Sequence, residues 1–132
     1  MRITPDTNLL VRALTHDDRP QAVSAETELV GADVVALSLV SLCELAWVLR
    51  RSYRVSSGEI AEGIRRLAAG DNVAVDRAAV DAGLALLDAG GDFADGVIAY
   101  QGRLLGADIF VSFDRRAVRR LEVLGEPARL LS

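Results

Sequence analysis

The chain has 132 residues, the length of one ordinary domain, and 51% of them are apolar, which is enough for a hydrophobic core and argues against disorder. One cysteine and one histidine are too few for an internal disulfide or a zinc site built on Cys and His, and since all fifteen basic residues are arginine, lysine chemistry is excluded. The net charge of −4 argues against a protein that coats nucleic acid, but it is compatible with an acidic metal pocket.

Short apolar runs alternate with longer helical patterns, which is typical of a parallel sheet covered by helices on both faces. In chain order, the first half predicts a strand at residues 2–5, a helix at 9–14, a helix at 20–30, a strand at 34–37 and a helix at 40–51. Pro5 is a conflict within the first strand, because proline has no N–H to donate to a ladder.

The second half begins with a capping-box pattern at Ser56 and Glu59, which predicts a helix that runs to Ala69. The remaining predicted elements are a strand at 73–75, a helix from 76 to 87, a helix from 92 to just before 106, a strand at 108–112, a helix at 115–124 and a strand at 128–131. With no linker and no internal repeat, the sequence predicts a single domain over residues 1–132.

No apolar run approaches the roughly 20 residues that span a bilayer, and the first residues lack the layout of a signal peptide. We therefore expect a soluble, cytoplasmic protein with no membrane partner.

Several acidic residues fall where open α/β sheets carry their active sites, outside the carboxyl ends of the strands. Asp6 and Asp114 each follow a predicted strand, Glu44 lies early in the helix after the second strand, and Asp92 and Asp95 share a face at a helix start. Such carboxylates repel one another unless cations neutralise them, and hard oxygen ligands select Mg²⁺ or Mn²⁺.

Four of these five acids also have a structural interpretation. Asp92 and Asp114 are suited to helix N-caps, Asp6 to a simple helix start, and Ser41 with Glu44 to a capping box. The residues alone therefore indicate an acidic pocket and leave open which acids are ligands.

Four segments, in this order and at these spacings, resemble the motifs of VapC-like PIN domains, which are ribonuclease toxins of type II toxin–antitoxin systems: residues 6–12, 38–44, 92–99 and 112–114. The resemblance covers essentially the whole chain. It departs from the pattern at Pro5 and at Ser112, where threonine is commoner, but neither departure removes a carboxylate.

The resemblance implies an α/β fold, a PIN-like α/β/α sandwich with a parallel five-stranded sheet. It implies four metal-binding, catalytic acids: Asp6, Glu44, Asp95 and Asp114. It implies accessory metal binding or support of the pocket by Asp92, Thr7, Asn8 and Ser112. It further implies a Mg²⁺- or Mn²⁺-dependent endoribonuclease that forms a homodimer and is inhibited by a VapB-like antitoxin.

Arginine guanidinium groups suit the phosphates of an RNA substrate, although an arginine-rich helix face is usually just solvated. The predicted RNA contacts are Arg12, Arg50, Arg115 and Arg116, the last two in a helix that also carries Arg119 and Arg120. Three alternatives remain: a PIN-fold module that binds RNA without cutting it, a DNA-directed nuclease, and a phospho-acceptor domain, against which the absence of lysine counts.

Overall fold

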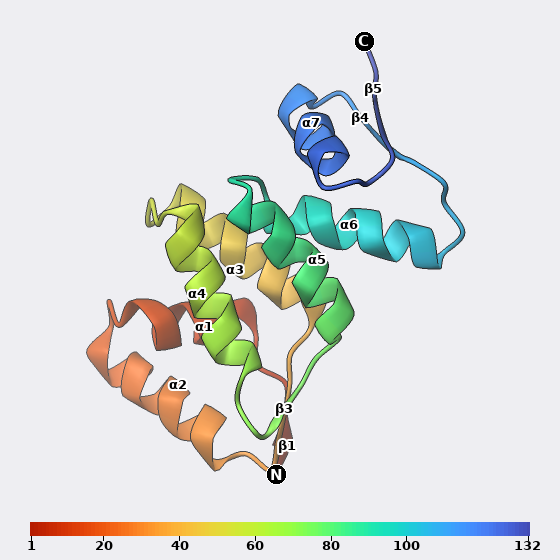
Figure 1. Ribbon diagram of the computed structural model, residues 1–132. Helices are drawn as coiled ribbons and strands as arrows, with labels where there is room; N and C mark the ends of the chain where they lie inside the picture. Colours follow the sequence, from red (N-terminus) through yellow and green to blue (C-terminus); the bar gives the residue numbers. More distant parts are fainter. The chain divides into compact units, whose positions relative to one another are not determined.

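The computed structural model describes residues 1–132 as seven helices and five short strands (Figure 1). The backbone divides into two compact units, an N-terminal unit over Met1–Asp76 and a C-terminal unit over Arg77–Ser132. None of the seven helices has both the length and the apolar character that crossing a bilayer requires. The single domain over residues 1–132 stays a prediction.

The N-terminal unit is a small parallel sheet with four helices. Its elements are β1 (Arg2–Ile3), α1 (Thr7–Thr15), α2 (Arg19–Gly31), β2 (Val34–Ala36), α3 (Leu39–Arg51), α4 (Ser57–Ala68) and β3 (Val73–Ala74). The central strand is β2, in which Val35 is in register with Ile3 on one side and with Val73 on the other. All three strands are parallel, so their carboxyl ends lie at one edge of this sheet.

The helix starts of this unit follow the local sequence. The side chain of Asp18 caps α2, which has Pro20 in its first turn, and the side chain of Ser56 caps α4. The core between the helices is wholly apolar, and its fully buried side chains are Leu10, Leu42, Leu45, Ile60 and Ile64. The predicted cap at Ser56 is confirmed, and the Glu59 carboxylate reaches back to accept a 3.2 Å hydrogen bond from the Ser56 hydroxyl.

The C-terminal unit pairs two helices and adds a two-stranded sheet. Its elements are α5 (Arg77–Asp88), α6 (Phe93–Leu104), β4 (Phe110–Ser112), α7 (Arg115–Val123) and β5 (Ala128–Leu130). The helices α5 and α6 pack closely because Gly83 and Gly96 lie at their crossing. The ring of Phe93 is 1% exposed and fills the space at Gly83, where a Cβ atom would come within 2.5 Å of it.

The predicted sheet is confirmed only in part, and two predicted boundaries near the N-terminus need correction. The five strands form a three-stranded and a two-stranded sheet, so the mixed α/β class and the parallel pairing are confirmed, whereas one five-stranded sheet stays a prediction. The first strand ends at Ile3 and does not reach Pro5, which has no N–H for a ladder. The first helix begins at Thr7, two residues before the predicted start, because Asp6 caps it.

Candidate functional site

Asp6 lies at the start of α1, just after β1, and its carboxylate is oriented by the helix. Asp6 Oδ1 accepts a hydrogen bond of 3.0 Å from the backbone N–H of Leu9. No hydrogen bond reaches the other oxygen, Oδ2, and the residue is exposed. The helix-start interpretation is confirmed, and it leaves one carboxylate oxygen available as a ligand.

Glu44 lies inside α3 and is held by a contact with the first helix. Because α3 begins at Leu39 and the hydroxyl of Ser38 accepts from the N–H of Ser41 at 3.2 Å, the capping-box interpretation of Ser41 and Glu44 is wrong. Glu44 Oε2 instead accepts a 2.8 Å hydrogen bond from the Thr7 hydroxyl. This bond brings Glu44 to the start of α1, next to Asp6.

In the C-terminal unit, Asp114 caps α7 directly after β4. Its Oδ1 accepts from the N–H groups of Arg116 at 2.9 Å and Ala117 at 3.2 Å, so the predicted cap is confirmed. The hydroxyl of Ser112 accepts from the N–H of Asp114 at 2.9 Å and fixes the turn between strand and helix. As at Asp6, the second carboxylate oxygen, Oδ2, accepts no hydrogen bond.

Asp92 and Asp95 lie at the start of α6, one turn apart. Asp92 occupies the N-cap position, but its side chain makes no capping hydrogen bond. Burial of the partly buried Asp95, together with the negative charges of Asp92 and Asp114, raises the pKa of Asp95 to about 6. The structure thus brings Asp92 and Asp114 near enough to Asp95 to repel its charged form.

One arginine lies beside these three acids. The positive charge of Arg120 on α7 lowers the pKa of Asp95 and offsets part of the shift. Its side chain lies along the turn before α6, where a Cβ atom on Gly91 would come within 2.9 Å of Arg120 Cδ. The sequence indicated Arg120 only as one arginine of a helix, because the turn that it contacts is 29 residues away.

The donor set of these acids fits a hard divalent cation. The chain offers carboxylate oxygens, which suit Mg²⁺ and Mn²⁺, and a cation would relieve the repulsion at Asp95. The structure has no group of three or more His, Cys, Asp or Glu side chains placed to hold a metal ion. Asp6 and Glu44 lie in the N-terminal unit, and Asp92, Asp95 and Asp114 lie in the C-terminal unit.

The four arginines predicted to contact RNA have different surroundings. Arg12 is held within the N-terminal unit, where its Nε donates to Gln21 and its Nη1 to Asp17. Arg50 donates to the hydroxyl of Ser57. Arg115 and Arg116 are exposed in the first turn of α7, where their side chains are accessible to a ligand.

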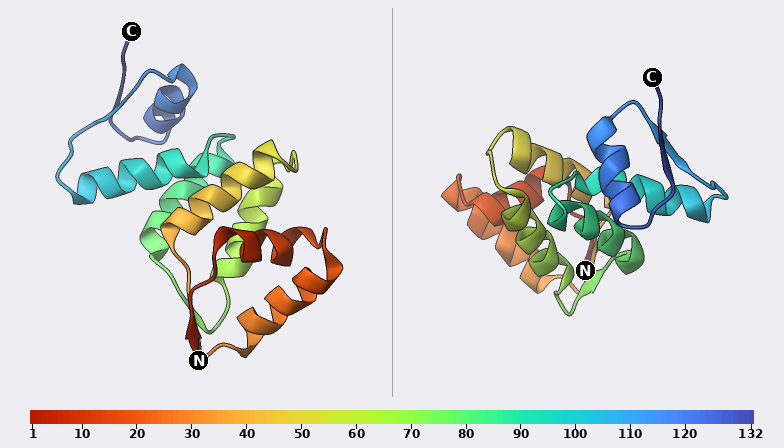
Figure 2. Two further views of the ribbon diagram at one scale, coloured as in Figure 1. Left: turned by 180° about the vertical axis from the view of Figure 1, so that it is seen from behind. Right: turned by 45° about the horizontal axis from the view of Figure 1, so that its top comes forward.

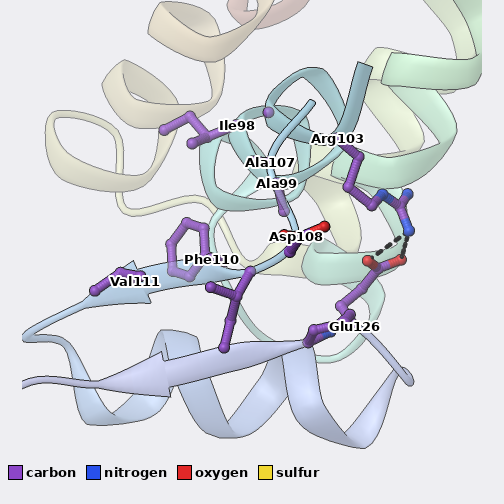
Figure 3. A pocket seen from close by; sticks show the side chains of 11 residues that line it. Ile98, Ala99, Arg103, Ala107, Asp108, Phe110, Val111 and Glu126 are labelled. Atoms are coloured by element: carbon purple, nitrogen blue, oxygen red, sulfur yellow. Dashed lines mark hydrogen bonds and ion pairs between the residues drawn. The ribbon is translucent and has the colours of Figure 1, made fainter. Parts of the chain in front are cut away.

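A pocket of about 190 Å³ in the C-terminal unit is lined by none of the predicted site residues (Figure 3). Its wall is mainly apolar and includes Ile98, Phe110 and Val111, and the Arg103–Glu126 ion pair of 2.7 Å lies at its side. The pocket has no metal-binding set of side chains, so it gives no support to a second catalytic site.

Comparison with known proteins identifies one family. A protein-family model described as PIN domain matches residues 3–123, which include Asp6, Glu44, Asp92, Asp95 and Asp114. No match was found among curated proteins, and none among solved structures.

Proposed function

The chain belongs to the PIN domain family, whose members are generally nucleases, and from this membership we propose that it is a metal-dependent endoribonuclease that hydrolyses RNA phosphodiester bonds. The observation that carries the proposal is the family match over nearly the whole chain. The crowded carboxylates around Asp95 support it, because they need a cation to neutralise them.

We propose Asp6, Glu44, Asp95 and Asp114 as the ligands of Mg²⁺ or Mn²⁺, with Asp92 as an accessory acid. The fixed orientation of three of them supports this assignment: helix N-terminal N–H groups hold Asp6 and Asp114, and the Thr7 hydroxyl holds Glu44. Each of the three keeps one oxygen without a hydrogen bond. Ligands held in place in this way lose little freedom when a cation binds.

In this proposal the acids and arginines of the chain position the water and the RNA phosphate for hydrolysis. The bound metal would supply an activated water and charge stabilisation of the leaving oxygen. The four acids would position that water against the phosphate, and the exposed guanidinium groups of Arg115 and Arg116 would bind neighbouring phosphate oxygens. No protein nucleophile is required, which suits a chain with one histidine and no lysine.

The experiment that tests this function is cleavage of labelled RNA and of DNA of the same sequence across Mn²⁺ concentrations. We expect cutting of RNA alone, dependent on metal and abolished by Asp95→Asn. A matched control is Asp81→Asn, an exposed acid of α5 that carries the same charge. Cutting of DNA would support a DNA-directed nuclease, and RNA binding without cutting at any Mn²⁺ concentration would support the non-cleaving module.

We also propose that this nuclease is the cytoplasmic toxin of a type II pair, that it forms a homodimer, and that a VapB-like antitoxin inhibits it. The motif resemblance supports this role. Expression of the wild-type chain should arrest growth of a bacterial host, and Asp95→Asn should not. Coexpression with the protein encoded directly upstream should restore growth, and growth that stays arrested would count against a toxin–antitoxin pair.

A further inference from the structure

A groove lies between α1 and α2 in the N-terminal unit, which also carries Asp6 and Glu44. It has a volume of about 360 Å³, within the roughly 300–1,000 Å³ usual for ligand sites. The two helices run side by side in both views (Figure 2). Its lining begins at Asn8, in the first turn of α1, the helix that Asp6 caps.

The groove has an apolar floor and polar walls. Ala25, 4% exposed, and Leu9 form the floor. The wall on α2 consists of Gln21, Ser24 and Glu28, which share one face of the helix by their spacing. An apolar floor with hydrogen-bonding groups around it suits a flat ring that has polar edges.

Much of the hydrogen-bonding capacity in this groove is unused by the protein. The side chains of Asn8, Ser24 and Glu28 make no hydrogen bond or ion pair. Arg12 is fixed through Nε, which donates to Gln21 Oε1 at 2.7 Å, and through Nη1, which donates to Asp17. Its Nη2 has no partner and is not a buried unsatisfied atom, so it is open to solvent.

The charges in the groove favour a base over a phosphate. Asp17 already neutralises Arg12, and the carboxylate of Glu28 would repel a phosphate. A carboxylate accepts hydrogen bonds, and among the RNA bases only guanine presents two adjacent donors, N1–H and the N2 amino group, on one edge. Arginine is in turn the commonest partner of the guanine acceptors O6 and N7.

We propose that the groove between α1 and α2 is a specificity subsite that binds an unpaired guanine of the substrate RNA, with Glu28 accepting from its N1–H and N2 amino groups and Arg12 and Asn8 facing its acceptor atoms. This inference rests on the proposed ribonuclease function. It deepens that function, because a base held against α1, the helix that Asp6 caps, would select which phosphodiester bond reaches the acids. Single-stranded RNA is the form that can place a base in such a groove.

The test measures binding without cleavage. Fluorescence anisotropy measures the affinity of the protein for labelled RNA pentanucleotides in a buffer that contains a chelator. The four pentanucleotides have uridine at both ends and differ only at the central position, which carries guanine, inosine, adenine or uracil. We expect guanine to bind about tenfold more tightly than adenine or uracil. Inosine, which lacks the N2 amino group, should lie between them.

Two variants of α2, each with one glutamate replaced by glutamine, test whether the preference for guanine arises in the groove. Glu28→Gln should remove most of the preference for guanine over inosine. Glu26→Gln makes the same change of charge on the same helix outside the groove lining, and it should keep the full preference. Both side chains are exposed, so both variants should fold.

Any one of three results would overturn the proposed subsite. These are equal binding of all four strands, no binding of any strand, and an unchanged guanine preference in Glu28→Gln. Because no metal is present, these results do not depend on catalysis. A wild-type chain that cuts RNA without any guanine preference contradicts only the subsite, whereas a guanine preference in a chain that never cuts contradicts only the proposed ribonuclease.

Discussion

At Asp6 and Asp114 a single carboxylate can cap a helix and still bind a cation. In both residues Oδ1 accepts from the helix N-terminus, and Oδ2 accepts no hydrogen bond. The capping bond fixes the rotamer, so the open oxygen is held in one place before a metal arrives. The structural and functional interpretations of these acids therefore do not exclude each other.

Asp95 gives the clearest link between charge and stability. Its pKa of about 6 lies above the ordinary value of 3.8, so the folded chain holds a proton that the unfolded chain releases, and stability falls as pH rises from about 4 to about 6. Asp95→Asn removes this penalty, and because solvent screens part of the charge on this half-buried side chain, we expect metal-free protein at pH 7 to gain about 1–2 kcal/mol in free energy of unfolding.

Urea unfolding in chelator at pH 5 and pH 7 measures this gain, which should be larger at pH 7. Asp81→Asn is the control, because that exposed acid should change stability little at either pH. A variant Asp95→Asn that is less stable than the wild type would show that burial and repulsion do not act on this carboxylate as we infer.

Thr7 positions Glu44 through one hydrogen bond. Replacing Thr7 by valine keeps the shape but removes the donor, and a hydrogen bond to a charged group contributes about 1.5–3 kcal/mol. We expect Thr7→Val to lower RNA cleavage by about tenfold or more and to raise the Mn²⁺ concentration for half-maximal cleavage. Thr7→Ser should restore both, and if it does not, the hydroxyl is not what supports Glu44.

Among the elements, the crossing of α5 and α6 depends on glycine. A Cβ atom on Gly96 would overlap the backbone carbonyl of Ala82, and backbone cannot move aside as a side chain can. We expect Gly96→Ala to lower the free energy of unfolding by about 2–3 kcal/mol, in the range for overpacking. Because Asp95 precedes Gly96, cleavage should fall as well.

Gly102→Ala is the matched change on the same helix. A Cβ atom there would meet only Ala107 Cβ at 3.8 Å, which is ordinary contact, so alanine should stabilise the helix by about 0.5–1 kcal/mol. Thermal unfolding of both variants gives the comparison. Similar loss of stability in the two variants would mean that the close approach at Gly96 is not the cause.

A polar cluster joins the turn between α1 and α2 to the end of α3. Asp17 accepts from the hydroxyls of Tyr53 at 2.6 Å and Thr15 at 2.9 Å and from Arg12 Nη1 at 2.8 Å. These bonds, first of all that of Tyr53, lower the pKa of Asp17 from 3.8 to about 2. The cluster therefore stabilises the fold above about pH 4, and this contribution is lost as pH falls towards 2.

Tyr53→Phe removes the largest contribution to that shift. We expect the pKa of Asp17 to rise towards 3.8, and the acid-sensitive range of the fold to begin at higher pH. NMR titration of the Asp17 carboxyl carbon in the two proteins measures the shift directly. An unchanged pKa in Tyr53→Phe would contradict the assigned cause.

The sequence predicted these elements well where the determinants are local. Pro20 and Ser56 mark helix starts that the structure confirms, because capping and proline geometry act within one turn. The capping-box prediction at Ser41 was wrong, because Ser38, three residues earlier, also carries a hydroxyl and is the residue that caps α3. The bond from Thr7 to Glu44 and the fit of Phe93 against Gly83 join distant residues, so no local pattern could reveal them.

At the scale of the whole molecule, the proposed ligands come from both units of the chain. The N-terminal unit supplies Asp6 and Glu44, and the C-terminal unit supplies Asp95 and Asp114. A cation that binds only the folded protein stabilises it by about 2.7 kcal/mol when its concentration is a hundred times its dissociation constant. For a chain of this length, that corresponds to a rise of roughly 5–15 °C in the melting temperature.

We therefore expect saturating Mn²⁺ to raise the melting temperature of the wild type by several degrees, and Asp6→Asn and Asp95→Asn each to remove most of that rise. If the two variants lose the same shift, Asp6 and Asp95 are both required for metal binding. Asp81→Asn should keep the full rise, because its carboxylate is not among the proposed ligands. A rise that survives in Asp6→Asn but not in Asp95→Asn would confine metal binding to the acids of the C-terminal unit and would contradict the four-ligand assignment.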